Sequence, residues 1–178
     1  MRRLAAMGLL LAVIAWAGWT FVVAPRRAAP VVAAPDSTSA GYRAVRLFFA
    51  APSGDRLVSE SRELPESATL HERVAALVSE LDRGPAGPGV AALPPGTSLL
   101  RVFLDADGLM TVDLSRAFQQ GFRGGTGADY LAIASLIRTL AANIPEVKRV
   151  LIVCGGEPIV TLGGHLPLDR SFDVSELP

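Results

Sequence analysis

Two segments of alternating apolar and polar residues, separated by a short turn, lie in the middle of the chain. The alternation covers Ser98 to Asp105 and Leu109 to Ser115, and residues 106–108 between them read Ala-Asp-Gly. An Asp-Gly turn flanked by alternating segments is a strong signal for a β-hairpin. We therefore expect a hairpin at the centre of the folded domain. Its alternating apolar positions are Leu100, Val102, Leu104, Met110, Val112 and Leu114.

Four further segments have the pattern of β-strands. Residues 43–50 and 56–64 flank turn residues Pro52 to Asp55, and the second of these strands is the more polar. Residues 147–154 are almost continuously apolar after Arg149, which predicts a central strand buried on both faces. Gly155-Gly156 then predicts a tight turn of the primed type, and Pro158 marks the returning strand, 157–162, as an edge.

Helical periodicity covers two segments. In the first, Thr69 and Glu72 form a capping box, and Gly84-Pro85 ends the helix. The second follows Gly124-Gly125-Thr126-Gly127, with Thr126 as the predicted N-cap, and ends near Asn143. Their apolar faces comprise Leu70, Val74, Leu77, Val78 and Leu81 in the first helix, and Tyr130, Ile133, Ala134, Ile137, Leu140 and Ala141 in the second.

The element order is therefore β-β-α-β-β-α-β-β. We predict an α+β fold in which two helices pack on one face of a mostly antiparallel or mixed sheet of about five to six strands. The folded domain is expected to span residues 43–170, followed by a tail at 171–178. The N-terminal residues 1–24 and the Ala-, Pro- and Ser-rich linker 25–42 precede it.

The N-terminal segment is an apolar run, Leu4 to Ala24, of 21 residues. As a helix it would span roughly 31 Å, about the thickness of a bilayer core. We expect a single-pass anchor in the cytoplasmic membrane, with the N-terminus inside and the domain on the extracytoplasmic side. The alternative is a cleaved secretory signal, although cleavage after Ala24 or Ala34 would place a proline first.

Charge and cysteine content exclude several classes of function. The chain is formally neutral, but four arginines lie before residue 36 and the remainder carries 13 basic and 17 acidic residues, a net charge of −4. An acidic domain argues against nucleic-acid binding. The single cysteine, Cys154, excludes an internal disulfide and a cysteine-rich zinc site.

An ordered set of short motifs carries a resemblance to a known family. Leu81-x-x-Gly84-Pro85 is followed by Leu93-Pro94-Pro95-Gly96-Thr97, by Val112-Asp113-Leu114-Ser115, by Thr139-Leu140, and by Leu162-x-Gly164-His165. This pattern resembles the GerMN domain of sporulation and germination proteins over residues 43–170. The resemblance implies a domain tethered to the bacterial membrane, similar to ring-building modules of envelope complexes, with no catalytic residues. It marks Gly84, Pro85, Pro94, Gly96, Asp113, Ser115, Thr139 and His165 as motif or interaction residues.

Candidate chemistry is sparse. Asp113 and Ser115 are interpreted as structural residues rather than as a contact site: Asp113 points away from the core, and Ser115 caps the next segment. Gly124 to Gly127 could cradle an anion but lacks the lysine of a phosphate loop. His71 is interpreted as a solvated helix residue, and Cys154 as a small hydrophobe at the end of a buried strand.

Three functional hypotheses follow. The first is a non-enzymatic envelope domain that binds other envelope proteins or self-associates. The second is a ligand or cell-wall glycan binding module, for which the plausible aromatic residues are Tyr42, Phe118, Phe122 and Tyr130. The third, disfavoured, is a small hydrolase using His165 and Asp169. No cofactor or metal site is predicted, because the two histidines are isolated and no metal-ligand spacing occurs.

Overall fold

The computed structural model describes residues 41–164 and 166–176, all of which belong to one compact unit, Ser39–Pro178. The predicted anchor, Leu4 to Ala24, the linker up to residue 40 and His165 lie outside the described residues. Within the described ranges, no helix is long and apolar enough to cross a membrane.

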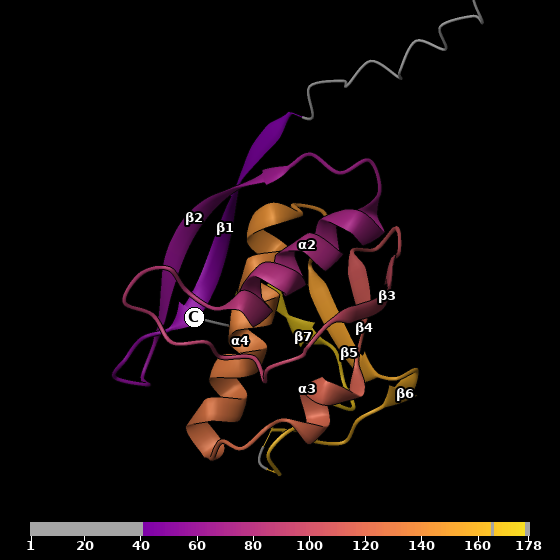
Figure 1. Cartoon of the computed structure of the whole chain (residues 1–178). Coiled ribbons are helices and arrows are strands. Elements are labelled where there is room, and N and C mark those ends of the chain that lie inside the picture. Colours follow the sequence, from indigo (N-terminus) through magenta and orange to yellow (C-terminus); the bar gives the residue numbers. More distant parts are fainter. Residues whose placement is uncertain (1–40, 165, 177–178) are drawn as a thin grey trace, which may run out of the picture. The chain divides into compact units, whose positions relative to one another are not determined.

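A five-stranded mixed sheet forms one layer of this unit (Figure 1). Its strands are β3 (Leu99–Leu104), β4 (Leu109–Leu114), β5 (Arg149–Cys154), β6 (Glu157–Pro158) and β7 (Phe172–Asp173). β4 and β5 pair in parallel, whereas β3 pairs with β4, and β6 and β7 pair with β5, in antiparallel fashion. Parallel neighbours need a crossover, and here α3 (Arg116–Gln120) and α4 (Thr126–Asn143) provide it.

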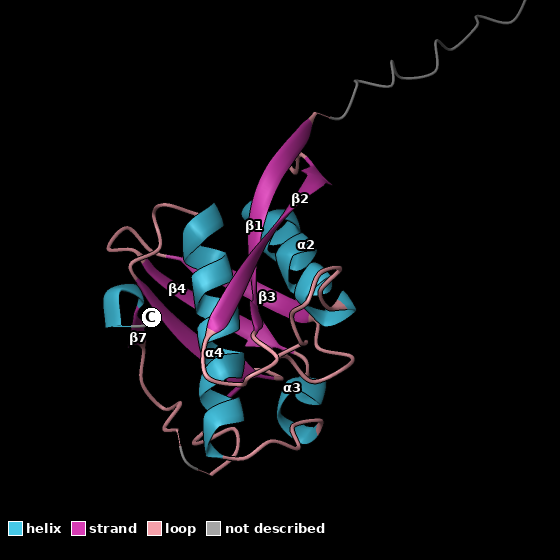
Figure 2. Ribbon diagram, turned by 90° about the vertical axis from the view of Figure 1, so that its left-hand side faces the viewer, coloured by secondary structure: helices cyan, strands magenta, loops and turns pink. Residues whose placement is uncertain are grey.

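A separate two-stranded sheet is formed by β1 (Tyr42–Ala50) and β2 (Leu57–Pro65). The helices α2 (Leu70–Arg83) and α4 lie between this hairpin and the five-stranded sheet, as Figure 2 shows. One hydrophobic core therefore joins the three layers. Its fully buried large side chains include Leu47 and Phe49 from β1, Leu81 from α2, Met110 and Leu114 from β4, Leu136, Ile137 and Leu140 from α4, and Ile152 from β5.

The predicted central hairpin is confirmed as β3–β4, with one correction in register. Asp105 Oδ1 accepts the N–H groups of Asp107 and Leu109 and thereby organises the turn. A bulge between Leu99 and Arg101 shifts the start of β3. Leu100, one of the alternating apolar positions, is 43% exposed, because the bulge places Leu99 against the core in its place.

The expectation of one sheet is wrong, because the first two strands form a sheet of their own. The expected strand 147–154 is central but buried on one face only, since Leu151 and Val153 are half-buried on the other. The returning strand is an edge, as predicted, but is limited to Glu157–Pro158. The Gly155-Gly156 turn has positive φ at both glycines, as the primed type requires.

The helix boundaries agree closely with the sequence pattern. Thr69 and Glu72 form the predicted capping box of α2, and Gly84 is its C-cap. The predicted cap of the second long helix is wrong: Gly125 is the N-cap of α4, and no side chain caps it. Three elements were not predicted, namely the short α3, β7 and the 3-10 turn η1 (Val174–Glu176).

Candidate interaction surface

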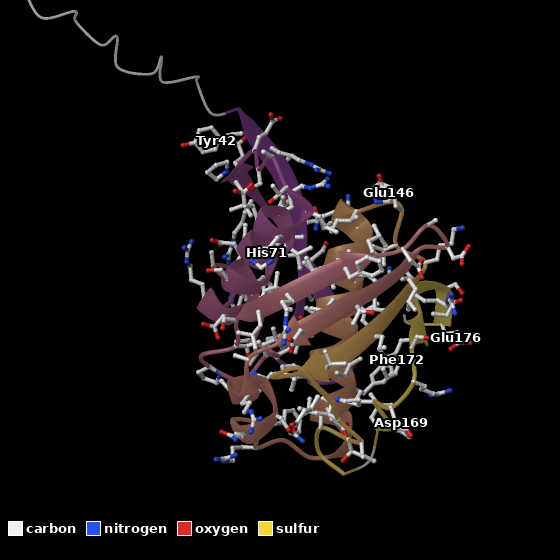
Figure 3. All side chains as sticks on the ribbon, turned by 90° about the vertical axis from the view of Figure 1, so that its right-hand side faces the viewer. Tyr42, His71, Glu146, Asp169, Phe172 and Glu176 are labelled. Atoms are coloured by element: carbon white, nitrogen blue, oxygen red, sulfur yellow. The ribbon has the colours of Figure 1, made fainter. Side chains whose placement is uncertain are left out.

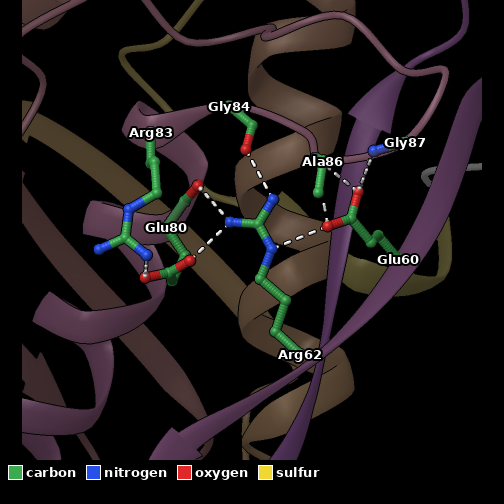
Figure 4. A network of polar contacts seen from close by, with 7 residues as sticks. All are labelled: Glu60, Arg62, Glu80, Arg83, Gly84, Ala86 and Gly87. Atoms are coloured by element: carbon green, nitrogen blue, oxygen red, sulfur yellow. Dashed lines mark hydrogen bonds and ion pairs between the residues drawn. The ribbon is translucent and has the colours of Figure 1, made fainter.

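Gly84, the first of the motif residues, ends α2 beside a network of charged groups that joins β2 to α2 (Figure 4). Its φ of 86° is a conformation that favours glycine, and its carbonyl accepts a 2.6 Å hydrogen bond from Arg62 Nη2. The same guanidinium bonds Glu60 Oε1 through Nε at 2.8 Å and Glu80 Oε2 through Nη1 at 2.5 Å. The Gly84-Pro85 motif therefore serves to place the C-terminus of α2 against Arg62.

Glu60 extends this network to the loop after α2. Its carboxylate accepts the N–H groups of Ala86 and Gly87. The hydrogen bond from Arg62, together with these backbone bonds, holds the pKa of Glu60 below its usual value. The network thus needs Glu60 ionised.

The motif residues around β4 also serve the fold. Asp113 is 4% exposed, and its two oxygens accept Arg101 Nε at 3.0 Å and the Gly156 N–H at 2.9 Å. Ser115 was predicted to cap the next segment, but its side chain makes no cap bond to α3. Instead its Oγ donates to the Gly96 carbonyl and accepts the Ser98 N–H, which holds the strand entry in place.

Pro94 and Gly96 shape the turn that leads into β3. The Pro94 carbonyl accepts hydrogen bonds from both the N–H and the Oγ1 of Thr97. Gly96 has φ +82°, which an L side chain rarely adopts. Pro94 and Gly96 thus have structural roles here.

Thr139 belongs to a row of buried polar residues on α4, Ser135, Thr139 and Asn143, that faces the edge of β1. Thr139 Oγ1 accepts the Phe48 N–H at 3.0 Å, and Asn143 Oδ1 accepts the Arg46 N–H at 3.0 Å. Ser135 Oγ donates to the Phe48 carbonyl, and Asn143 Nδ2 to the Arg46 carbonyl. Side chains at helical spacing therefore satisfy the polar groups of this edge of β1, with which no other strand in the described part of the chain pairs.

The hydrolase hypothesis gains no support from the described residues. Cys154 is 3% exposed, and burial, with a smaller effect from Asp113, raises the pKa of its thiol to about 11. A neutral buried thiol is a poor nucleophile. Asp169 is exposed, and His165 lies outside the described residues. Residues 41–164 and 166–176 contain no group of three metal-ligating side chains.

The structure also bears on the remaining sequence hypotheses. His71 is exposed, as predicted (Figure 3). Asp129 is fully buried in the first turn of α4, and a carboxylate there disfavours an anion at the Gly124 to Gly127 loop. A glycan platform of stacked aromatics is not formed by the four candidates: Tyr42 is exposed, whereas Phe118 is buried and Phe122 and Tyr130 pack against the core.

The outer face of the five-stranded sheet is left uncovered by the helices (Figure 3). We call it the open face and define it by Arg101 and Phe103 on β3, Thr111 on β4, and Leu151 and Val153 on β5. Phe103, Thr111 and Leu151 are direct cross-strand partners in one row. Phe103 is 66% exposed, whereas Thr111, Leu151 and Val153 are half-buried. This face combines apolar side chains with the outer edge of β3, on which no strand of residues 41–164 and 166–176 pairs.

Several residues that hold the fold together were missed by the sequence reasoning. Arg62 and Arg101 were missed because Glu80 and Asp113, with which they form ion pairs, lie on other elements, although Glu60 lies only two residues from Arg62. Ser135, Thr139 and Asn143 do carry one, since polar residues at i, i+4 and i+8 in an apolar helix need buried partners. Phe103 was likewise readable as an apolar residue on the polar side of an alternating strand.

These features define a class: an α+β domain whose motif residues, where described, hold the fold, and whose sheet leaves one face open. The chain belongs to the family described as Germane, sporulation and spore germination, whose model matches residues 46–160. The family assignment made from the short motifs is thereby confirmed.

Solved structures show the same fold. The first GerMN domain of the sporulation protein GerM from Bacillus subtilis superposes with a TM-score of 0.60 at 18% identity, over 75% of this chain and 98% of that one. The tandem GerMN domains of the same protein give 0.62 at 17% identity, over 76% of this chain and 48% of theirs. A structure described as "Putative Lipoprotein from Clostridium perfringens" gives 0.55 at 20% identity, over 78% and 91%. No curated protein matches the chain in sequence.

Proposed function

We propose that this chain is a membrane-tethered envelope domain that acts without catalysis, by binding another envelope protein or a second copy of itself through the open face. The single observation that carries the proposal is the exposure of Phe103 in a row with Thr111 and Leu151. Apolar patches that the fold leaves uncovered mark interaction sites in soluble domains. The family's sporulation and germination description, and relatives that include a structure described as a lipoprotein, support an envelope setting.

The free edge of β3 adds a second means of binding to the same surface. Backbone N–H and C=O groups on an unpaired edge accept a further strand, and neighbouring side chains then give specificity. On β3, Arg101 is held by Asp113, while Phe103 is directed away from the core. A partner strand or face docking here would cover Phe103 and leave the motif residues undisturbed.

Site-specific photocrosslinking in the membrane tests this proposal. A photoreactive phenylalanine analogue replaces Phe103 in the full chain, and the matched control replaces Val160, which is 71% exposed but lies outside the open face. We expect adducts from position 103 and not from position 160, with the adduct mass separating a second copy from another protein. In a second experiment the analogue replaces Val153, also on the open face. Adding Phe103→Asp to that variant should abolish the adduct formed from position 153. Absence of any adduct from position 103, or equal adducts at both positions, would overturn the proposal.

A further inference from the structure

A cleft of about 160 Å³ opens between the base of the β1–β2 hairpin, α2 and the end of α4. The apolar part of its lining includes Val45 from β1, Leu64 from β2, Leu77 from α2 and Ile144 after α4. An engineered protein cavity of about 150 Å³ holds one benzene molecule, so this cleft has room for about six heavy atoms. It lies on different elements from the open face and is independent of it.

Two arginines line this cleft, and only one of them has a partner. Arg43 Nη2 donates to the Asn143 carbonyl at 2.9 Å, where the C-terminal end of α4 presents its free carbonyl groups. Arg73, in the second turn of α2, is half-buried, and its Nε is buried without a hydrogen-bond partner. Among the described residues, its guanidinium makes no ion pair either. A buried, unpaired N–H of a charged group is costly.

The acidic side chain that lines the cleft does not neutralise Arg73. Glu66 also lines the cleft, but it is exposed and forms no ion pair with either arginine of the cleft. Arg62, by contrast, is matched to the carboxylates of Glu60 and Glu80. Arg73 therefore differs from Arg62, which is also half-buried, by having no carboxylate partner among the described residues.

We infer that this cleft binds a carboxylate carried by a short aliphatic group, such as the C-terminal residue of a peptide that ends in alanine. The guanidinium of Arg73 takes the carboxylate, and the walls formed by Val45, Leu64, Leu77 and Ile144 take the aliphatic part. An alanine residue with a free carboxylate has the size that the cleft admits. A sugar ring, which carries many hydroxyl groups and no charge, fits neither the apolar walls nor the unpaired cation.

Titration of the full chain in detergent with small probes tests this inference. The probes are N-acetyl-alanyl-alanine, its C-terminal amide, and butyrate, with binding followed by calorimetry and by NMR shifts of residues around the cleft. We expect the acid to bind and the amide to bind at least about tenfold more weakly, because a charge-assisted pair is lost. Binding of butyrate as well would assign the site to short carboxylic acids in general. Binding of the dipeptide acid alone would assign it to peptide ends.

Arg73→Gln and a matched control make the test specific. Arg73→Gln should weaken binding of the acid at least about tenfold and leave the unfolding midpoint unchanged or raised, since Arg73 Nε is buried without a partner among the described residues. Arg56→Gln removes the same charge from the opposite end of the hairpin and should bind as the parent does. Equal binding of acid and amide, no binding of either acid, or an unaltered affinity in Arg73→Gln would each overturn the inference.

Discussion

Arg62 is the residue through which the hairpin, α2 and the following loop are joined. Its three nitrogens contact Glu60, Glu80 and the Gly84 carbonyl, and the guanidinium carbon lies 5.5 Å from the centre of the Phe49 ring. The side chain of Arg62 is 15% exposed and that of Glu80 is 6% exposed, so this ion pair lies largely out of water. Removing one partner of such a pair costs more than forming it gains, because the other charge stays buried.

Replacing Arg62 by Met is therefore expected to destabilise the domain by about 2–3 kcal/mol. The matched control is Arg83→Met, because Arg83 contacts the same Glu80 at 2.7 Å but its side chain is 70% exposed. An exposed pair contributes about 0–1 kcal/mol, so the control should change little. Urea unfolding of the full chain in detergent measures both. Similar losses in the two variants would contradict the ion-pair account.

Glu60 gives the domain a defined pH dependence at the acidic end. Its pKa is lower in the folded state than the ordinary value of 4.5, so its contribution to stability is present above about pH 4.5 and is lost as pH falls through the folded pKa. The difference in unfolding free energy between the parent and Glu60→Gln should therefore shrink between pH 5 and pH 3. A difference that stays constant over that range would show that Glu60 does not titrate with folding.

At the scale of elements, α4 holds the hairpin by side chains in place of a neighbouring strand. Ser135 and Thr139 bond Phe48, and Asn143 bonds Arg46, the alternate residue of β1. The four-residue step from Thr139 to Asn143 rises about 6 Å along the helix, which is close to the rise of about 6.6 Å over two residues of a strand. The sequence indicated the helix and its apolar face but not this row, because the row's partners lie some 90 residues earlier in the chain. The division into two sheets was missed for the same reason. The alternation of residues in a strand indicates which face is buried and where the strand ends. Which strands pair with one another depends on contacts between residues that are distant in sequence.

Thr139→Val tests this row, because valine keeps the shape of threonine and removes its hydroxyl. The Phe48 N–H then loses its acceptor in a buried position, at a cost of about 1–2 kcal/mol. Hydrogen exchange of the Phe48 amide should accelerate specifically. The control is Thr111→Val on the open face, where no side-chain hydrogen bond is lost and valine suits a strand, so stability should be unchanged or higher. An unchanged Phe48 exchange rate in Thr139→Val would contradict this role.

At the scale of the whole molecule, the sequence predicted the features that depend on neighbouring residues. It did not predict the arrangements that depend on contacts between distant segments. The β3–β4 hairpin, the capping box of α2 and the glycine turn before β6 were predicted from the sequence because each is decided within a few residues. The open face and the cleft could not be predicted in this way. Asp113 bonds Arg101 within the β3–β4 hairpin, whereas the open face follows from where the helices pack, and the cleft follows from the meeting of the hairpin, α2 and α4. Neither arrangement is encoded in any one segment.

The proposed attachment of this domain to a membrane leads to a separate prediction. The full chain should remain in membranes washed with alkaline carbonate, and mass spectrometry should find the segment Leu4 to Ala24 uncleaved. Protease added to intact spheroplasts should remove the domain if it lies outside. A soluble product that lacks this segment would support the cleaved secretory signal instead.

The parallel pairing of β4 with β5 has a consequence for how the chain folds. Leu109 pairs with Arg149, so this contact closes a loop of 40 residues that contains α3 and α4, whereas both hairpins close over short turns. Local hairpins form in about 1–10 μs, and non-local pairings form later because the entropy of loop closure opposes them. We expect joining of β4 to β5 to limit the folding rate. Val112→Ala and Ile152→Ala should then slow refolding in stopped-flow experiments, whereas Thr139→Val, if the hairpin docks afterwards, should chiefly speed unfolding.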